Sequence, residues 1–179
     1  MSDRRKQLSL VAAIMGSFVA GLDATAVNVA LGATGTVLID NCTMTNNGSN
    51  GANAYVKVST TAGSAVVLIS NCTLQGSNFA GNGVLAGNGA SVTISNSVFQ
   101  TFANGAQTTG TGALFVDTSV FANNINALNA AGGAINIGNN AFYANSTAFA
   151  GAGSYVSDGR NRIGGAGAQG ATPTPMNVK

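Results

Sequence analysis

The sequence predicts an all-β protein, a right-handed parallel β-helix (solenoid) of about five coils, preceded by an N-terminal hydrophobic helix. Three observations support this fold class. An eight-residue motif recurs five times after residue 33, its apolar residues come in bursts of three or four, and Asn-rich or Gly-rich segments separate the copies. Such a repeat is typical of a stack in which each coil contacts only its neighbours.

The five copies of the motif align without gaps. They are Val37–Met44, Val67–Leu74, Val92–Phe99, Leu114–Phe121 and Ile135–Phe142. The third position of each copy is β-branched, as a buried strand position favours. From copy to copy the repeat shortens from 30 residues to 21. This suits coils joined by loops of variable length and does not suit a helical repeat with a period of 3.6 residues.

Two further columns of the motif have a structural interpretation. The eighth position is large and apolar, which predicts a second inward-facing column: Met44, Leu74, Phe99, Phe121 and Phe142. The fifth position favours Asn, which tolerates the left-handed backbone of a sharp turn and can hydrogen-bond from coil to coil. We therefore predict a structural ladder of Asn41, Asn71, Asn96, Thr118 and Asn139.

Other segments complete the expected coil. Tyr55–Val58 and Gly83–Leu85 have the apolar pattern of additional strands. Stretches rich in Asn and Gly predict the corners between strands. They are residues 46–53, 76–83 and 103–112.

The repeats resemble the right-handed parallel β-helix repeat proteins of the pectate-lyase-like superfamily. The segment Gly153–Ile163, in which Ser154 and Tyr155 precede Gly159, Asn161 and Ile163, is similar to the closing segment of such proteins. The resemblance covers roughly residues 33–170 and implies the C-terminal coils of a longer family member. It implies little about activity, because this fold supports many functions.

The first 32 residues differ from the repeats. Residues 8–31 are mostly apolar, and as a helix they would reach about 36 Å, enough to span a bilayer. Within them, Leu22–Leu31 reads Leu-Asp-Ala-Thr-Ala-Val-Asn-Val-Ala-Leu and resembles the first transmembrane helix of drug–proton antiporters of the major facilitator superfamily. Gly32 stands where that family has Pro, and the resemblance implies an intramembrane role for Asp23.

Three interpretations of this segment stay open. With Arg4, Arg5 and Lys6 before it and Ala24–Ala26 as a cleavage site, it reads as a signal peptide. It also suits an uncleaved membrane anchor, or a helix that caps the first coil. The domain prediction is therefore 1–32 as a hydrophobic N-terminal segment, 33–163 as the β-helix and 164–179 as a flexible tail containing Gly and Pro.

The composition argues against catalysis. The chain has no His and no Glu, which removes the commonest acid–base groups and metal ligands. Asp40 and Asp117 occupy the same column three coils apart, about 14 Å by coil spacing, whereas glycosidase carboxylates lie about 5–9.5 Å apart. We predict no catalytic, cofactor-binding or metal-binding residue, and no cofactor.

The two cysteines fall in the sixth motif position of neighbouring coils. In-register stacking would bring the Cα atoms of Cys42 and Cys72 about 5 Å apart, inside disulfide range. The parallel direction of their side chains favours a stack of free thiols. Two cysteines without other ligand types do not predict a metal site.

These features predict a non-enzymatic, secreted or surface-displayed solenoid with a structural or adhesive role. The alternatives are a carbohydrate-binding or polysaccharide-lyase-like fragment, and a membrane-anchored chimera whose first helix derives from a transporter. Candidate partners are surface glycans or other β-solenoids, with membrane contact through residues 8–31. The net charge of +2 leaves no basic stripe for nucleic acid. The expected location is extracellular or at the cell surface, or anchored in the inner membrane.

Overall fold

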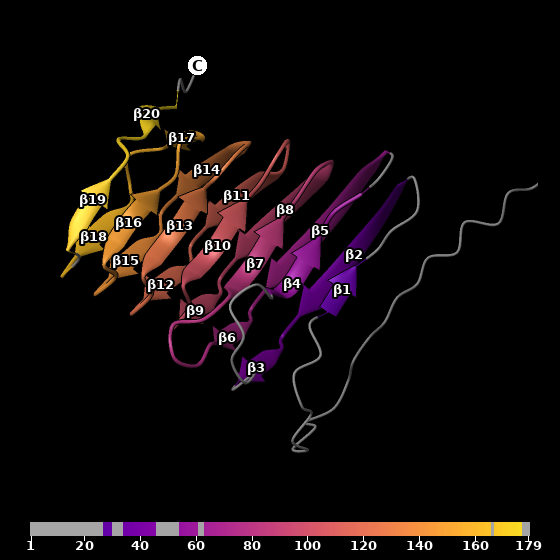
Figure 1. Ribbon diagram of the computed structural model, residues 1–179, viewed down its shortest axis with the longest axis horizontal. Coiled ribbons are helices and arrows are strands. Elements are labelled where there is room, and N and C mark those ends of the chain that lie inside the picture. The colour runs from indigo at the N-terminus through magenta and orange to yellow at the C-terminus, as the bar shows by residue number, and fades with distance from the viewer. Residues whose placement is uncertain (1–26, 30–33, 46–53, 61–62, 166, 177–179) are drawn as a thin grey trace, which may run out of the picture.

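The chain winds through three β-sheets in a fixed order and then returns to the first (Figure 1). The computed structural model describes residues 27–29, 34–45, 54–60, 63–165 and 167–176. Within these ranges, every regular element is a β-strand, and each strand inside a sheet pairs in parallel with the strand one turn before it and the strand one turn after it. The predicted all-β parallel solenoid is therefore confirmed.

Each coil contributes one strand to each sheet, which we name A, B and C. Sheet A contains β1 (Val27–Val29), β4 (Ala54–Val58), β7 (Asn82–Ala86), β10 (Asn104–Thr108), β13 (Asn126–Ala130), β16 (Thr147–Ala150) and β19 (Ala168–Gly170). Sheet B contains β2 (Thr34–Asp40), β5 (Ser64–Ser70), β8 (Ala90–Ser95), β11 (Ala113–Asp117), β14 (Ala134–Gly138), β17 (Ser154–Ser157) and β20 (Thr174–Pro175). Sheet C contains β3 (Thr43–Thr45), β6 (Thr73–Gln75), β9 (Val98–Gln100), β12 (Val120–Ala122), β15 (Ala141–Tyr143) and β18 (Arg162–Gly164).

The five motif copies form five successive coils, as predicted. The first half of each copy is a strand of sheet B, and the last residues are a strand of sheet C. The register pairs the third motif positions directly, as in Ile39 with Ile69 and Ile69 with Ile94. Strands β16–β18 continue the three sheets, and β19 and β20 carry sheets A and B past residue 163, into the segment expected to be a flexible tail.

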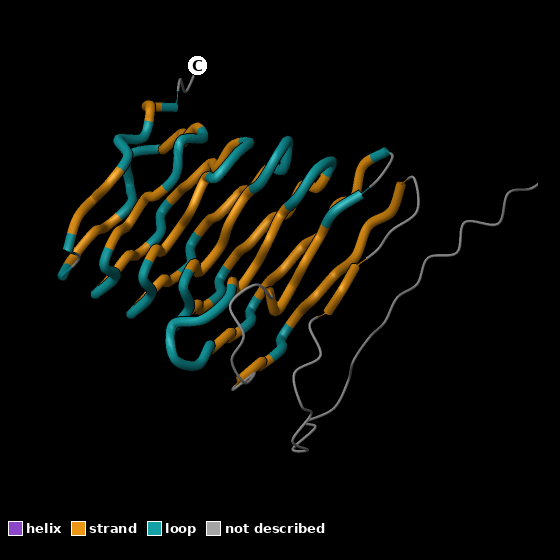
Figure 2. The backbone as a smooth tube through the Cα atoms, in the orientation of Figure 1, coloured by secondary structure: helices purple, strands orange, loops and turns teal. Residues whose placement is uncertain are grey.

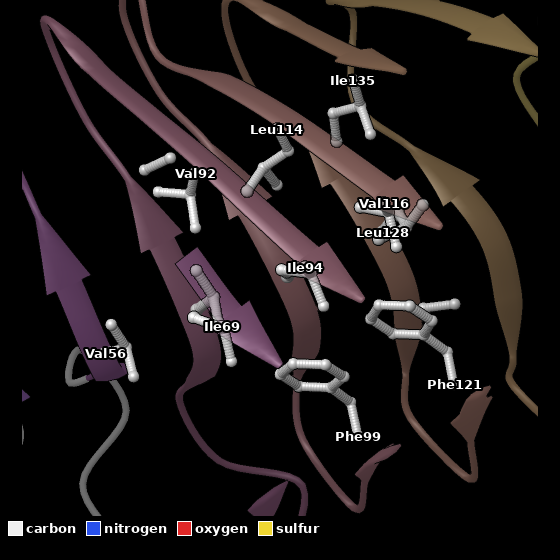
Figure 3. Close-up of a cluster of buried hydrophobic side chains, with 14 of the residues drawn as sticks. Val56, Ile69, Val92, Ile94, Phe99, Leu114, Val116, Phe121, Leu128 and Ile135 are labelled. Atoms are coloured by element: carbon white, nitrogen blue, oxygen red, sulfur yellow. The ribbon is translucent and has the colours of Figure 1, made fainter. Parts of the chain in front are cut away.

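The interior of the solenoid is made by the two apolar columns that the motif predicted. The β-branched column is buried in every coil: Ile39, Ile69, Ile94, Val116 and Ile137. Figure 3 shows Ile94 and Val116 beside Phe99 and Phe121 in this interior. Residues of sheet A, such as Val56 and Leu128, close the third side. One continuous core therefore runs along the stack.

Aromatic rings form the second inward column in the later coils. The ring centroids of Phe99 and Phe121 lie 4.9 Å apart and nearly parallel, and those of Phe121 and Phe142 lie 5.6 Å apart. Phe149 of β16 meets Phe142 edge-on at 5.0 Å. Residues of sheet A that pack directly against these rings must therefore be small. A methyl group on Gly105 would lie 2.6 Å from Phe121 Cδ1, so this position excludes any larger residue.

The fifth motif position makes the turn between sheets B and C, and all five of its residues have positive φ. The angles, between 47° and 54°, belong to Asn41, Asn71, Asn96, Thr118 and Asn139. The left-handed backbone expected of them is present, and their side chains are exposed. Their side-chain hydrogen bonds between coils are irregular: Asn139 Nδ2 donates to Thr118 Oγ1 at 3.4 Å, whereas Asn71 Nδ2 donates to Asp40 Oδ1 at 2.8 Å.

The regular buried stack lies one residue further along, in the column that begins with the two cysteines. Cys72 N–H donates to Ser97 Oγ, Ser97 N–H to Ser119 Oγ, and Ser119 N–H to Asn140 Oδ1. Asn140 N–H in turn donates to Asn161 Oδ1 at 2.9 Å. Stacked polar side chains therefore do bridge the coils, but in the column next to the one we predicted, because the left-handed turn directs the following residue inward.

A second buried stack lies at the corner between sheets C and A. Phe102 N–H donates to Asn124 Oδ1, and Asn124 N–H donates to Asn145 Oδ1, each at 3.0 Å. The side-chain amides of Asn124 and Asn145 donate to the carbonyls of Phe99 and Phe121. These amides satisfy backbone groups that strand pairing leaves free, which is how a sharp corner can be buried.

Two expectations are corrected by the structure. The part of the predicted N-terminal helix that the structure describes is a strand: Val27–Val29, inside the apolar segment 8–31, form β1 in register with Val56–Val58 of β4. The described chain contains no helix long and apolar enough to cross a membrane (Figure 2). The rest of that segment, with the cleavage site and Asp23, lies outside the described residues. Residues 103–112, expected to be a corner, contain β10, which pairs with apolar strands on both sides.

The turn position gives a first testable prediction. Replacing Asn96, whose φ is 47° and whose side chain is exposed, by Val should lower the free energy of unfolding by about 1–2 kcal/mol, because a β-branched residue is strained in the left-handed region. Asn96→Gly removes the same side chain without this strain. Chemical denaturation of both variants would check the prediction, and equal losses would contradict it.

Candidate functional site

The outward surface of sheet B is the most regular surface that the described chain presents. Its strands alternate between buried and exposed residues, so every second side chain points to solvent. The middle row of this surface crosses six coils in register: Leu38, Leu68, Thr93, Phe115, Asn136 and Val156. We name these residues, with the rows on either side, the outer face of sheet B.

The middle row exposes large apolar side chains. Leu38 is 60% exposed, Phe115 is 44% exposed and Leu68 is 39% exposed. Val66, in the adjacent row, is also exposed. Scattered exposed apolar residues are ordinary on a protein surface, whereas apolar residues gathered in register on one face are a feature of interaction surfaces.

Charge on this face is confined to one edge. The edge row contains Asp40, Ser70, Ser95, Asp117 and Gly138, and Asp158 follows next to Gly138 at the end of β17. Within the described strands of sheet B, Asp40 and Asp117 are the charged residues, whereas Asp158, just after β17, forms an ion pair with Arg160. The face is therefore apolar in its middle and negative along one side.

Two of these carboxylates converge over a glycine. A methyl group placed on Gly138 would lie 3.1 Å from Asp117 Oδ1 and 3.2 Å from Asp158 Oδ2. The two oxygens are thus no more than about 6 Å apart, a spacing within the range of paired glycosidase carboxylates. The pair weighed from the sequence was Asp40 with Asp117, and the pair of Asp117 with Asp158 was missed. Aligning Tyr155–Asp158 with Ile135–Gly138 as a sixth coil would have revealed it.

The surroundings of Asp158 hold its carboxyl group in the ionised form. Arg160 Nε lies 2.8 Å from Asp158 Oδ2, and Arg160 N–H donates to Asp158 Oδ1 at 2.9 Å. Burial opposes ionisation of Asp158, but the hydrogen bonds and charge of Arg160 outweigh it and lower the pKa of the carboxyl group. A general acid needs a raised pKa, so this environment does not suit Asp158 to that role.

Asp40 is also held in its ionised form. Ser70 Oγ donates to Asp40 Oδ1 at 2.5 Å and Asn71 Nδ2 donates to the same oxygen at 2.8 Å. These two hydrogen bonds, the one from Ser70 first, lower the pKa of Asp40. Asp40 therefore carries a fixed negative charge near neutral pH and is a poor proton donor.

This arrangement gives a second testable prediction, on pH dependence. Because the pKa of Asp40 is lower in the folded state, its contribution to stability is present above the unfolded pKa of about 3.9 and is lost as pH falls through the folded value. The Ser70→Ala variant removes the main donor and keeps the carboxylate. Its unfolding temperature should therefore fall less between pH 5 and pH 2 than that of the parent protein, as measured by circular dichroism. Parallel pH profiles would contradict the prediction.

A cavity of about 300 Å³ lies at the C-terminal end of the stack. Ile137 and Phe149 form part of its apolar lining, and Pro173 and Met176 of the final segment line it as well. Among its polar lining residues, Asn161 has its side chain hydrogen-bonded within the protein, since Asn161 Nδ2 donates to Ser157 Oγ at 2.9 Å. The cavity is thus the end of the hydrophobic core beneath the last strands.

The closing segment anchors this end of the solenoid. Tyr155 Oη accepts from Ala130 N–H at 2.9 Å and donates to Ala150 O at 2.6 Å. Burial raises the pKa of Tyr155 to about 12, so the phenol stays protonated and serves as a structural hydrogen-bonding group. Asn161 completes the buried stack below Asn140.

The remaining candidate groups are also structural. Cys42 and Cys72 are free thiols in the same column, with Cys42 N–H 3.4 Å from Cys72 Sγ. Burial is the main factor that raises the pKa of Cys72, which makes it a poor nucleophile. Within the described part of the chain, no three Cys, Asp, His or Glu side chains gather as metal ligands would.

Comparisons with known proteins add no assignment: no family model, no curated protein and no solved structure matches the chain.

Proposed function

We propose that the protein is a non-enzymatic β-solenoid, secreted or displayed at a cell surface, with a structural or adhesive role in which the outer face of sheet B makes the contact. The supporting observation is the in-register row of exposed Leu38, Leu68 and Phe115 on a face whose charges stand along one edge. A rigid stack holds these side chains in fixed positions, so contact costs little conformational entropy.

The proposal includes a finer fold assignment, the right-handed parallel β-helix of the pectate-lyase-like superfamily. Two features support it: three strands per coil that form three parallel sheets, and a closing segment in which Tyr155 and Asn161 both hydrogen-bond to the preceding coil. A catalytic role of the kind found in that superfamily is not part of the proposal, because the chain has no His and no Glu and because Asp158 is engaged by Arg160.

Adhesion can be tested with matched triple variants. Leu38→Ser, Leu68→Ser and Phe115→Ser together remove the apolar row, whereas Phe79→Ser, Ile125→Ser and Tyr143→Ser remove equally exposed apolar side chains that lie outside sheet B. Binding to a methyl-terminated monolayer is measured by quartz-crystal microbalance. We expect the first variant to lose most of its binding and the second to keep it, since only the first disrupts the outer face. Equal losses would sink the proposal.

Catalysis is tested separately, by incubating the protein with polygalacturonate and following the absorbance of unsaturated products. No increase over buffer is expected. A rate that depends on protein concentration and disappears in Asp117→Asn would replace the non-enzymatic role by a lyase-like one.

A second candidate is binding of a neutral glycan, which one observation favours. Phe115 lies in register between Thr93 and Asn136, so an aromatic ring is flanked by a hydroxyl and an amide on the same face. Sugars bind to such combinations of apolar platform and hydrogen-bonding groups. The acidic edge disfavours polyanions such as pectin. Retention on cellulose that is lost in Phe115→Ala and kept in Tyr143→Ala would favour this candidate.

A further inference from the structure

Among the described residues, the core is covered differently at the two ends of the solenoid. At the C-terminal end, Ala171 packs against the core, and Met176 N–H donates to Ser157 O at 2.8 Å. At the N-terminal end, Val37, Cys42 and Met44 are only half-buried, although their counterparts one coil later, Val67, Cys72 and Leu74, are fully buried. Among the described residues, none covers the first coil of the core as residues 171–176 cover the last.

Strand β2 forms the edge of sheet B at this open end. Asn41 N–H, at the end of the strand, donates to Ser70 O of β5. Because backbone groups alternate in direction along a strand, the N–H and C=O groups of Thr36, Leu38 and Asp40 point away from β5, toward the edge. No described strand pairs with that edge.

Natural proteins usually protect such edges, and the opposite end of sheet B is protected. Strand β20 is two residues long and includes Pro175, which has no N–H group to donate. Strand β2 is seven residues long, contains no Pro, and carries one charge, on Asp40. A long, nearly neutral edge of this kind is a template for pairing with another strand.

We propose that β2 is the interface of a homodimer, in which the β2 strands of two copies pair antiparallel around a two-fold axis at Val37. This register is the one that pairs all seven residues, from Thr34 to Asp40. It places Thr36 opposite Leu38 of the second copy, so the free groups of these residues meet as a hydrogen-bonded pair. The interface is isologous and closes on itself without extending into a fibre.

The side chains suit this register. Val37 meets Val37 of the second copy, so the half-buried inner column of each first coil meets its own counterpart and the two cores become continuous. Asp40 meets Thr34 of the second copy, so no like charges stand opposite each other. A second copy therefore satisfies the free backbone groups of β2 and covers the half-buried side chain of Val37.

The test uses a proline at an edge position. Leu38 has its N–H at the free edge and a side chain that is 60% exposed, so Leu38→Pro removes one edge donor and leaves the β2–β5 hydrogen bonds in place. Leu38→Ala is the matched control: it shortens the same side chain and keeps the donor. Sedimentation velocity of the full chain over a range of concentrations reports the assembly.

We expect the parent protein and Leu38→Ala to sediment as dimers, and Leu38→Pro to dissociate at a concentration at least tenfold higher. Circular dichroism of the proline variant checks that it is folded. If Leu38→Pro unfolds, amide exchange of the parent protein decides instead: the Leu38 N–H should exchange at least tenfold more slowly in the dimer. A parent protein that stays monomeric, or a dimer that Leu38→Ala weakens as much as Leu38→Pro, would overturn the proposal.

Discussion

Replacing Phe121 by Ala is expected to lower the free energy of unfolding by about 3–5 kcal/mol, the usual cost of removing a buried aromatic ring. Phe121 is fully buried and lies between Phe99 and Phe142, with ring centroids at 4.9 and 5.6 Å. The loss should be at the upper end of this range, because strands on both sides fix the neighbouring coils and limit collapse into the cavity. Denaturation by urea, with the midpoint and slope both fitted, measures it.

The control for Phe121→Ala is Phe115→Ala, the same substitution six residues earlier in the same coil. Phe115 is 44% exposed on the outer face of sheet B, so its loss should change the free energy of unfolding by about 0.5 kcal/mol or less. Similar losses for the two variants would mean that the inward and outward faces of this coil are wrongly assigned.

Replacing Asn140 by Leu is expected to cost about 2–4 kcal/mol, although Leu is of similar size and more apolar. Asn140 Oδ1 accepts from Ser119 N–H at 2.9 Å, and its amide donates to Val116 O at 2.8 Å. Both partners lie in the interior, and an unsatisfied buried group costs about 1–3 kcal/mol. The same urea titration measures the loss.

Asn136→Leu is the matched control, because Asn136 lies four residues before Asn140 in the same coil, on the outward side of β14. The side chain of Asn136 makes no hydrogen bond to the described residues, and its replacement should change the free energy of unfolding by no more than about 0.5 kcal/mol. A stabilised Asn140→Leu protein would show that the buried stack acts as an ordinary apolar filler and does not satisfy the backbone.

The sequence predicted sheets B and C because they coincide with the motif. Their strands alternate apolar and polar residues, as in Ser64–Ser70, and that alternation is itself the signal of a half-buried strand. Direct pairing of equivalent positions, such as Ile69 with Ile94, follows from stacking the repeats in register.

Sheet A was largely missed for a physical reason. Its later strands, such as Asn104–Thr108 and Asn126–Ala130, are rich in Asn, Ala and Gly, which have little intrinsic preference for strands. They are extended because the strands above and below offer them backbone partners, so their structure is set by tertiary context. Small residues are required there, since Gly105 faces the ring of Phe121.

The polar stack shows a similar limit at the level of single residues. The fifth motif position was correctly expected to adopt the left-handed conformation, as Asn41 and Asn139 show. The direction of the next side chain depends on how that turn meets sheet C, which a sequence pattern does not reveal. Ser97 and Ser119, unremarkable in sequence, therefore hold the inward position.

The candidate surface could be derived only in part. Exposed positions such as Leu38 and Phe115 follow from alternation along the motif, but the approach of Asp117 and Asp158 depends on a sixth coil that the motif does not mark. Because Ser154–Ser157 does not match the eight-residue motif, the sequence alone did not place Asp158 on the same edge of sheet B as Asp117.

The central claim is that successive motifs stack in register, each one coil spacing from the next. Distances between pairs of spin labels, measured by electron–electron resonance, test it. Spin labels are placed on the middle row at Leu68 and Val156 in one variant, and at Leu38 and Val156 in another, with Cys42 and Cys72 replaced by Ser, the residue that fills their column at positions 97 and 119. An excess of unlabelled protein restricts the signal to distances within one chain. The account predicts narrow distributions near about 19 Å and about 24 Å, differing by one coil spacing of about 4.8 Å. Broad distributions, or a difference that follows the length of chain between Leu38 and Leu68, would contradict it.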